Sequence, residues 1–131
     1  REHYVSKAAS DISALPSVRI KLVELQREIA KNECVVMDGR DIGTYVLPDA
    51  KYKFFITATP EVRAKRRFDE LKAKGDAPSY EKVLEDIKVR DYNDSHRAFA
   101  PLKQADDAVL VDTTNMSIDE VIYFVLNKME K

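Results

Sequence analysis

Six arginines, spread over three stretches of the chain, could bind a phosphate group: Arg40, Arg63, Arg66, Arg67, Arg90 and Arg97. A guanidinium fork matches two phosphate oxygens at once, which an ammonium group does not. Phosphoryl transfer needs several cations around a group whose charge is spread over its oxygens. These arginines would suit that chemistry if the elements that carry them fold over the carboxyl end of one sheet.

Residues 38–44 form a charged loop with two acids, one arginine and two glycines, directly after the apolar run of residues 34–37. In open α/β sheets, ligands bind outside the carboxyl ends of the strands, so this loop is a candidate binding site. An Asp-Gly pair is also a common turn signal, and an ordinary turn is the alternative.

Arg90, Asp94 and Arg97 share one face of a predicted helix, because their spacing is i, i+4, i+7. Asp86, Arg90 and Asp94 also form a ladder of alternating charge, which is typical of a solvated surface. The basic run at residues 63–67 is equally typical of a wet helix face. Without aromatic interleaving or net positive charge, nucleic acid is not an expected partner.

Composition indicates a soluble globular chain of one domain or less, with 131 residues, 44% hydrophobic and 34% charged, and a net charge of −1. Cys34 is the single cysteine, so neither an internal disulfide nor a cysteine cluster for zinc is expected. No apolar run has the length of a membrane span and no secretory signal is visible, so a cytoplasmic location without a membrane partner is expected. The chain begins with Arg1, so we do not expect a complete reading frame.

The hydrophobic periodicity predicts strands over residues 34–37, 52–58 and 108–111, and helices over residues 1–14, 18–31, 60–74, 79–96 and from 118 onward. Ser17 and Thr59 are predicted helix caps, and Ser117 with Glu120 is a predicted capping box. Strands that alternate with helices predict an α/β fold with a parallel sheet. The link over residues 38–51 shows no helical pattern, although a parallel crossover normally needs a helix. We therefore expect this link to pass over one neighbouring strand of the sheet, a strand that these residues do not contain.

Several segments, taken in order, closely resemble bacterial cytidylate kinase (CMP/dCMP kinase), a P-loop nucleoside monophosphate kinase. They are residues 5–10, 12–13, 16–19, 38–44, 66–67, 90–91, 94, 97–101, 112–114 and 117–118. The resemblance covers essentially all 131 residues. It implies a three-layer α/β fold with a parallel sheet, in which residues 1–131 are the C-terminal part of one domain and about 63–97 form the lid and its flanking helices. The implied reaction transfers the γ-phosphoryl group of ATP to CMP or dCMP, with Mg²⁺, in a protein that is monomeric when complete.

The resemblance also implies a role for each site residue. The cytosine contacts are Ser10, Arg19 and Asp41; the ribose contacts are Arg90 and Asp94; the CMP phosphate contacts are Arg40 and Arg97. Arg66 and Arg67 match lid arginines that close over the transferring phosphoryl group, and Thr113 lies in a segment that resembles the one near the ATP base. Asp38 matches an acid beside the P-loop that would hold water bound to Mg²⁺ and would not ligate the metal directly. The implied catalytic residues are Asp38, Arg40, Arg66, Arg67 and Arg97.

One family feature is not found in these residues. The three glycines, Gly39, Gly43 and Gly75, do not stand in the P-loop pattern G-x-x-x-x-G-K-[ST], whose amides cradle phosphates. The resemblance is therefore to the family's C-terminal portion. The P-loop strand is expected upstream of Arg1 in the sequence and, in the sheet, between the strands at 34–37 and 52–58. We expect the 131 residues alone neither to transfer phosphate nor to fold stably, because two apolar strand edges would lack their shared neighbour. The alternatives are a related kinase with another small-molecule acceptor and a non-catalytic nucleotide-binding or assembly fragment.

Overall fold

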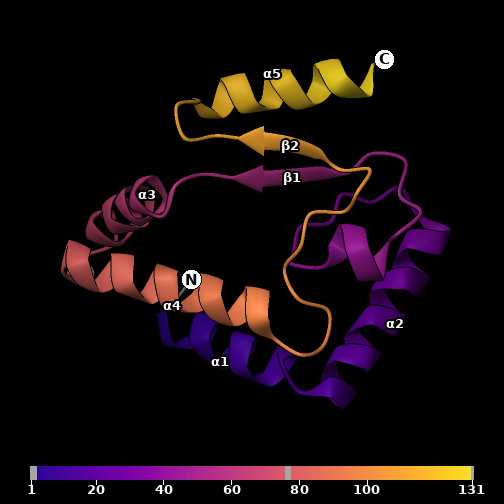
Figure 1. Cartoon of the computed structure of the whole chain (residues 1–131), viewed down its shortest axis with the longest axis horizontal. Coiled ribbons are helices and arrows are strands. Elements are labelled where there is room, and N and C mark those ends of the chain that lie inside the picture. Colours follow the sequence, from indigo (N-terminus) through magenta and orange to yellow (C-terminus); the bar gives the residue numbers. More distant parts are fainter. Residues whose placement is uncertain (1–2, 76–77, 131) are drawn as a thin grey trace.

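The computed structural model describes residues 3–75 and 78–130, which form helices around a small parallel sheet (Figure 1). Strands β1 (Phe54–Thr57) and β2 (Val109–Asp112) pair in parallel, with Phe54 opposite Val109 and Thr57 opposite Asp112. This confirms the predicted mixed α/β class and two of the three predicted strands. No helix in the described ranges is both long enough and apolar enough to cross a membrane.

The prediction of a strand over residues 34–37 is wrong. Residues 34–38 have no regular secondary structure, and the side chain of Val36 is fully exposed. A strand is defined by hydrogen bonds to a neighbouring strand, and β1 and β2 pair only with each other within the described part of the chain. The apolar run identified a strand-like sequence, but sequence alone could not supply the pairing partner.

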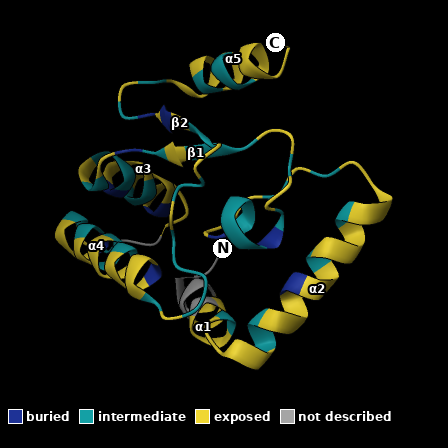
Figure 2. Ribbon diagram, turned by 45° about the vertical axis from the view of Figure 1, so that its right-hand side comes forward, coloured by how far each residue is buried: buried dark blue, intermediate teal, exposed yellow. Residues whose placement is uncertain are grey.

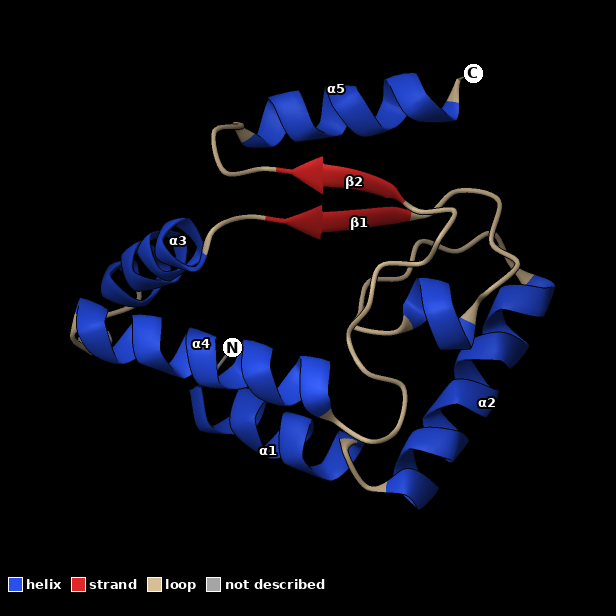
Figure 3. Ribbon diagram, viewed as in Figure 1, coloured by secondary structure: helices blue, strands red, loops and turns tan. Residues whose placement is uncertain are grey.

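Two helices open the chain, α1 (His3–Ser13) and α2 (Pro16–Asn32), and Figure 3 shows a sharp turn of the chain between them. The predicted cap at Ser17 is wrong, because Leu15 is the N-cap of α2 and makes no side-chain cap bond. Pro16 occupies the first turn, where its fixed φ suits a helix and its missing N–H costs nothing. The proline therefore starts the helix before Ser17.

The link between α2 and β1 contains one turn of wide helix, η1 (Ile42–Val46), which the sequence did not predict. The carbonyl of Asp41 accepts hydrogen bonds from the amides of Tyr45 at 2.8 Å and Val46 at 3.1 Å. A single turn is too short for a helical period to be visible in the sequence. At Gly39, a Cβ atom would come within 2.8 Å of the Ile42 side chain, so a larger residue would require that side chain to move.

Helix α3 (Pro60–Ala73) follows β1, and the predicted cap is confirmed: the Thr59 hydroxyl accepts from the Val62 amide at 3.4 Å. The helix ends before Gly75, whose φ of +79° is left-handed and suits glycine. Helix α4 (Tyr80–His96) comes next and begins at Ser79, as predicted.

Helices α3 and α4 pack against each other around Ala64, Leu71 and Val83, which are buried. The rings of Phe68 and Tyr80 meet edge to face, with centroids 6.2 Å apart. This packing fixes the position of α4, the helix that carries both predicted ribose contacts and is followed directly by a predicted phosphate contact.

Helix α5 (Ile118–Met129) lies beside the sheet in Figures 1 and 3. Its predicted capping box is confirmed, because the Ser117 hydroxyl accepts from the Glu120 amide while the Glu120 carboxylate accepts from the Ser117 amide. Tyr52 donates its hydroxyl to the carbonyl of Met129 at 2.9 Å, which ties the end of α5 to the segment before β1.

Figure 2 shows that much of α2 is exposed, and several large apolar side chains are among the exposed residues of that helix. Ile56 on β1 is 58% exposed and Leu110 on β2 is 53% exposed. In the observed register these two residues point to opposite faces of the sheet, because Ile56 lies opposite Val111 and not opposite Leu110. Each face of the sheet therefore exposes a large apolar side chain.

Candidate functional site

The carboxylate of Asp41 lies between two arginines that come from distant parts of the chain. Asp41 is only 2% exposed. Arg19, in the first turns of α2, forms an ion pair with its Oδ1 atom, and Nη2 of Arg97, at the end of α4, lies 3.6 Å from the same oxygen. Asp41 itself precedes η1, so three separate segments meet at this carboxylate.

Three atoms of this group are buried and have no hydrogen-bond partner in the structure: Asp41 Oδ2, Arg19 Nε and Arg97 Nη2. Leaving a buried polar group unpaired costs about 1–3 kcal/mol, so native proteins rarely do so without a reason. Together the three atoms offer one hydrogen-bond acceptor and two donors to a ligand. That pattern suits a polar ring or an anion.

A second carboxylate, that of Asp94 on α4, lies between two further arginines. Arg40 donates from Nε to Asp94 Oδ2 at 2.8 Å, and Nε of Arg90 lies 3.7 Å from the same oxygen. The side chain of Asp94 is 11% exposed, whereas those of Arg40 and Arg90 are 40% and 49% exposed. Because Arg40 and Asp41 are consecutive, the two carboxylates belong to one site.

We call this site the Asp41 cluster; its members are Arg19, Arg40, Asp41, Arg90, Asp94 and Arg97. Four guanidinium groups face two carboxylates, which leaves a local excess of positive charge in a chain whose net charge is −1. Burial lowers the pKa of Arg97, and the nearby charge of Arg19 lowers it further. An anion beside Arg97 would favour the charged guanidinium, so the cluster is suited to accept negative charge.

Arg66 and Arg67 lie on α3 and have different partners. Arg66 donates to the Thr113 carbonyl at 2.7 Å, to the Thr113 hydroxyl at 3.1 Å and to the Met116 carbonyl at 3.3 Å. The Thr113 hydroxyl in turn donates to the carbonyl of Thr57 at 3.0 Å. Within the described ranges, no hydrogen bond or ion pair joins Arg66 or Thr113 to the Asp41 cluster.

The other predicted lid arginine, Arg67, donates to Glu70 at 2.8 Å on the same helix, and Lys74 donates to Glu70 at 2.6 Å. Lys74 and, second, Arg67 lower the pKa of Glu70 to about 2. The structure therefore brings Arg66 together with Thr113 and gives Arg67 a local partner.

Two predicted site residues, Ser10 and Asp38, add no described contact to the candidate site. Ser10 lies on α1, but its side chain is outside the described part of the structure. Asp38 is exposed, in the irregular segment before η1. No group of three histidine, cysteine or acidic side chains that could hold a metal ion is found among the described residues. Mg²⁺ is usually held by one or two carboxylates together with substrate phosphates and water, and Asp38 supplies only one exposed carboxylate, so we assign no step to the metal.

A hollow of about 470 Å³ runs along α5 and the loop before it. Its lining includes Met116, Glu120, Tyr123 and Lys128. It shares no lining residue with the Asp41 cluster, and none of the buried unpaired atoms found in the described ranges belongs to its lining. The cluster is therefore the stronger candidate site.

The sequence analysis assigned no role to two residues that hold this region together. Asp91 forms a two-bond ion pair with Arg63, and Arg27 donates to two carbonyls of η1. No local pattern could have revealed either contact, since the partners are 28 and at least 18 residues apart in the chain. Arg27 occupies an exposed position on a helix, where an arginine is ordinary.

Comparison with known proteins gives one family. The family model described as cytidylate kinase matches residues 1–131. Relatives named cytidylate kinase include those of Caldicellulosiruptor saccharolyticus, 54% identical over 131 residues, and Bacteroides thetaiotaomicron, 57% identical over 116 residues. These alignments cover 100% and 88% of this chain, and 58% and 51% of the relatives. The chain thus spans little more than half the length of the curated relatives it matches.

Proposed function

Because this chain belongs to the cytidylate kinase family, we propose that its Asp41 cluster binds CMP or dCMP as the acceptor of the γ-phosphoryl group of ATP. The products would be ADP and CDP or dCDP. One observation carries the proposal: the 2% exposed carboxylate of Asp41 keeps one buried oxygen unpaired, beside unpaired nitrogens of Arg19 and Arg97. A buried group of this kind needs a polar ligand that supplies the missing partners.

Cytosine supplies complementary groups for Asp41 and Arg19. Its exocyclic amine donates to a carboxylate oxygen such as Asp41 Oδ2, and its ring nitrogen and carbonyl accept from a guanidinium such as that of Arg19. Uracil reverses two of these groups and would leave buried partners unpaired, at a cost of about 1–3 kcal/mol each. Ser10 is proposed as the third cytosine contact. Discrimination between the two bases follows directly from this pairing.

The rest of the cluster is proposed to hold the sugar and the phosphate. Asp94 accepts hydrogen bonds from ribose hydroxyls, with Arg90 beside it. Arg40 and Arg97 bind the CMP phosphate, which supplies the negative charge that this group of arginines favours. The 2.8 Å bond from Arg40 to Asp94 orients the guanidinium for this task.

Catalysis in this proposal depends on position and charge. The acceptor phosphate is already anionic, so no general base is needed for in-line attack on the γ-phosphorus. ATP bound with Mg²⁺ supplies the phosphoryl group. Arg66 and Arg67, in a lid region of about residues 63–97, are proposed to neutralise charge on that group. Arg66 must then exchange its bonds to Thr113 and Met116 for bonds to phosphate oxygens.

Calorimetric titration with CMP and with UMP, of a protein that joins these residues to a P-loop segment, tests the acceptor site. We expect CMP to bind at least about tenfold more tightly than UMP, which corresponds to about 1.4 kcal/mol. Asp41→Asn should bring the two affinities close together, because an amide can donate as well as accept. Asp49→Asn, in the exposed loop after η1, removes the same charge and should preserve the preference. Unchanged CMP preference in Asp41→Asn would refute the assignment of Asp41.

Release of ADP from ATP in the presence of CMP tests the reaction itself. We expect none from the 131 residues, because they hold no P-loop pattern, and CMP-dependent release from a protein that joins them to a P-loop segment. Binding of CMP without release in the joined protein would favour the alternative, a non-catalytic nucleotide-binding role. Release by the 131 residues alone would refute the proposed division of roles.

A further inference from the structure

Arg27, on the exposed side of α2, reaches the far end of η1. Its Nε donates to the carbonyl of Val46 at 2.9 Å, and its Nη2 donates to the carbonyl of Tyr45 at 2.6 Å. The last carbonyls of a helix have no partner within the helix and need one from outside. The planar guanidinium fork presents donors on two separate nitrogens in a fixed geometry, which the single nitrogen of a lysine cannot do. Arg27 therefore fixes the C-terminal end of η1 to α2.

The Arg27 side chain also lies against the ring of Tyr45, which in turn contacts the ring of Phe99. The guanidinium carbon of Arg27 lies 5.4 Å from the centre of the Tyr45 ring. The Tyr45 ring meets Phe99 edge to face, with centroids 5.0 Å apart. Phe99 belongs to the segment that follows α4. One arginine on α2 thus contacts η1 directly and the segment after α4 through one aromatic ring.

Each end of this chain of contacts adjoins a member of the Asp41 cluster. The Asp41 carbonyl accepts from the amides of Tyr45 and Val46, so Asp41 is held by the residues whose carbonyls Arg27 binds. Phe99 stands two residues after Arg97. A side chain that holds Tyr45 therefore constrains both Asp41 and Arg97.

The segment around Phe99 also needs such support. Ala100 has a φ of 47°, in the left-handed region that costs a non-glycine residue about 1 kcal/mol. Its carbonyl accepts from Arg97 Nε at 2.6 Å, so the strained residue orients the arginine. A conformation of this kind persists only where its surroundings enforce it. The Tyr45–Phe99 contact is one such constraint.

We propose that Arg27 is a positioning residue for the Asp41 cluster: through Tyr45 and Phe99 it sets the relative positions of Asp41 and Arg97. The part of this inference that concerns base selection rests on the proposed function of the cluster as the CMP site. Arg27 touches none of the cluster's side chains in the contacts described above. Its effect on the ligand is indirect, through the backbone of η1 and the segment after α4.

Amide hydrogen exchange, measured without ligand in the protein that joins these residues to a P-loop segment, tests the positioning itself. In Arg27→Lys, which keeps the charge but loses the fork, we expect exchange to rise about tenfold or more in residues 41–47 and 97–102. Exchange in α3 and the first turns of α4 should stay unchanged. Lys31→Gln, exposed one turn later on α2, is the control and should change neither segment. Unchanged exchange in both segments of Arg27→Lys would overturn the proposal.

Ligand selectivity separates positioning from simple support of the fold. A lower folded fraction weakens CMP and UMP binding by the same factor, whereas a displaced Asp41 reduces the ratio between them. We expect Arg27→Lys to reduce the CMP-to-UMP affinity ratio several-fold, and Phe99→Leu to reduce it less. If the unsubstituted protein, joined to a P-loop segment, binds CMP and the ratio is unchanged in both variants, the inference is wrong. If this unsubstituted protein does not bind CMP, the proposed function is wrong, and the exchange measurement still decides the positioning role.

Discussion

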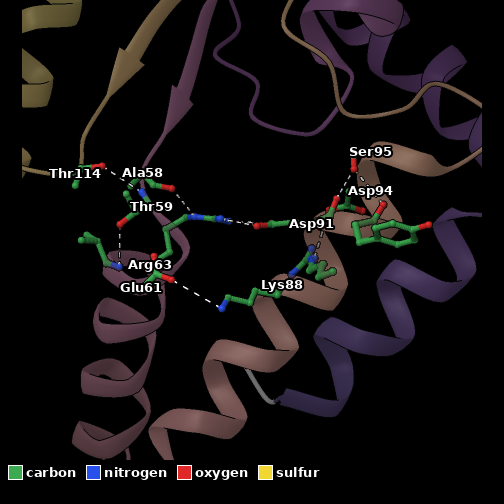
Figure 4. A network of polar contacts seen from close by, with 12 residues as sticks. Ala58, Thr59, Glu61, Arg63, Lys88, Asp91, Asp94, Ser95 and Thr114 are labelled. Atoms are coloured by element: carbon green, nitrogen blue, oxygen red, sulfur yellow. Dashed lines mark hydrogen bonds and ion pairs between the residues drawn. The ribbon is translucent and has the colours of Figure 1, made fainter.

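Arg63 and Asp91 join helix α3 to helix α4 through two hydrogen bonds, at 2.9 and 2.5 Å. This pairing with Asp91 raises the pKa of Arg63. Arg63 also donates from Nε to the carbonyl of Ala58, directly after β1, at 3.0 Å (Figure 4). A single side chain thus connects the carboxyl end of a strand to the helix that carries Arg90 and Asp94.

Breaking this pair should measurably destabilise a protein that joins these residues to a P-loop segment. We expect Asp91→Asn to lower the free energy of unfolding by about 1 kcal/mol, near the upper end for ion pairs that are partly exposed, because two bonds are lost together. Urea unfolding followed by circular dichroism measures the change. Asp69→Asn breaks the more exposed pair with Lys65 within α3 and is the matched control, with an expected change near zero. Equal losses in the two variants would contradict this account.

Arg66 and Arg67 are adjacent and chemically identical, yet their contacts predict different results. Arg66→Ala removes three bonds to Thr113 and Met116, so amide exchange in residues 113–116 should rise several-fold. Arg67→Ala removes one exposed bond to Glu70 and should leave that loop unchanged. Exchange measured by mass spectrometry compares the two variants. If both variants loosened the loop equally, the contacts of Arg66 would not be what holds it.

The helix caps offer a second matched pair. The Ser117 hydroxyl accepts from the Glu120 amide, so Ser117→Ala should cost about 1 kcal/mol of stability. Ser17 caps no helix in the described structure, and Ser17→Ala should change stability by less than about 0.5 kcal/mol. Thermal unfolding of both variants measures the difference. A larger loss of stability in Ser17→Ala would indicate that Ser17 does cap the helix, as the sequence predicted.

Local chemistry explains which parts of the fold were predictable. Thr59 and Ser117 cap their helices with bonds that span three residues, so the sequence contains both partners. The prediction of a cap at Ser17 was wrong because the adjacent Pro16 sets the start of the helix. The prediction of a strand at residues 34–37 was wrong because pairing depends on a neighbouring strand that a local pattern does not reveal.

The candidate site was predictable to a different degree. The i, i+4 spacing of Arg90 and Asp94 placed them on one helix face, and the structure places their polar atoms 3.7 Å apart. The family resemblance implied that Arg19 and Asp41 contact the base, and Arg97 the phosphate, of one ligand, but it did not predict the contact between Arg97 and Asp41. No spacing relates residues on three separate segments. Arg27 was found by neither route, since its partners are backbone carbonyls, which any sequence offers.

The lowered pKa of Glu70 predicts how its contribution to stability depends on pH. Its carboxylate accepts from Lys74 and Arg67, and these bonds lower its pKa from 4.5 to about 2. A lowered pKa in the folded state means that the contribution to stability is complete above about pH 4.5 and is lost as the pH falls toward 2. Carbon-13 NMR titration of the side-chain carboxyl group measures the value directly.

Lys74→Met should raise the pKa of Glu70 toward its ordinary value, since Lys74 is the larger of the two causes. Lys65→Met, whose lysine pairs with Asp69 on the same helix, should leave the pKa of Glu70 unchanged. An ordinary pKa for Glu70 in the unsubstituted chain would show that both bonds are too transient to matter. In that case Arg67 would be free of its local partner, and its proposed approach to the transferring phosphoryl group would need no exchange of bonds.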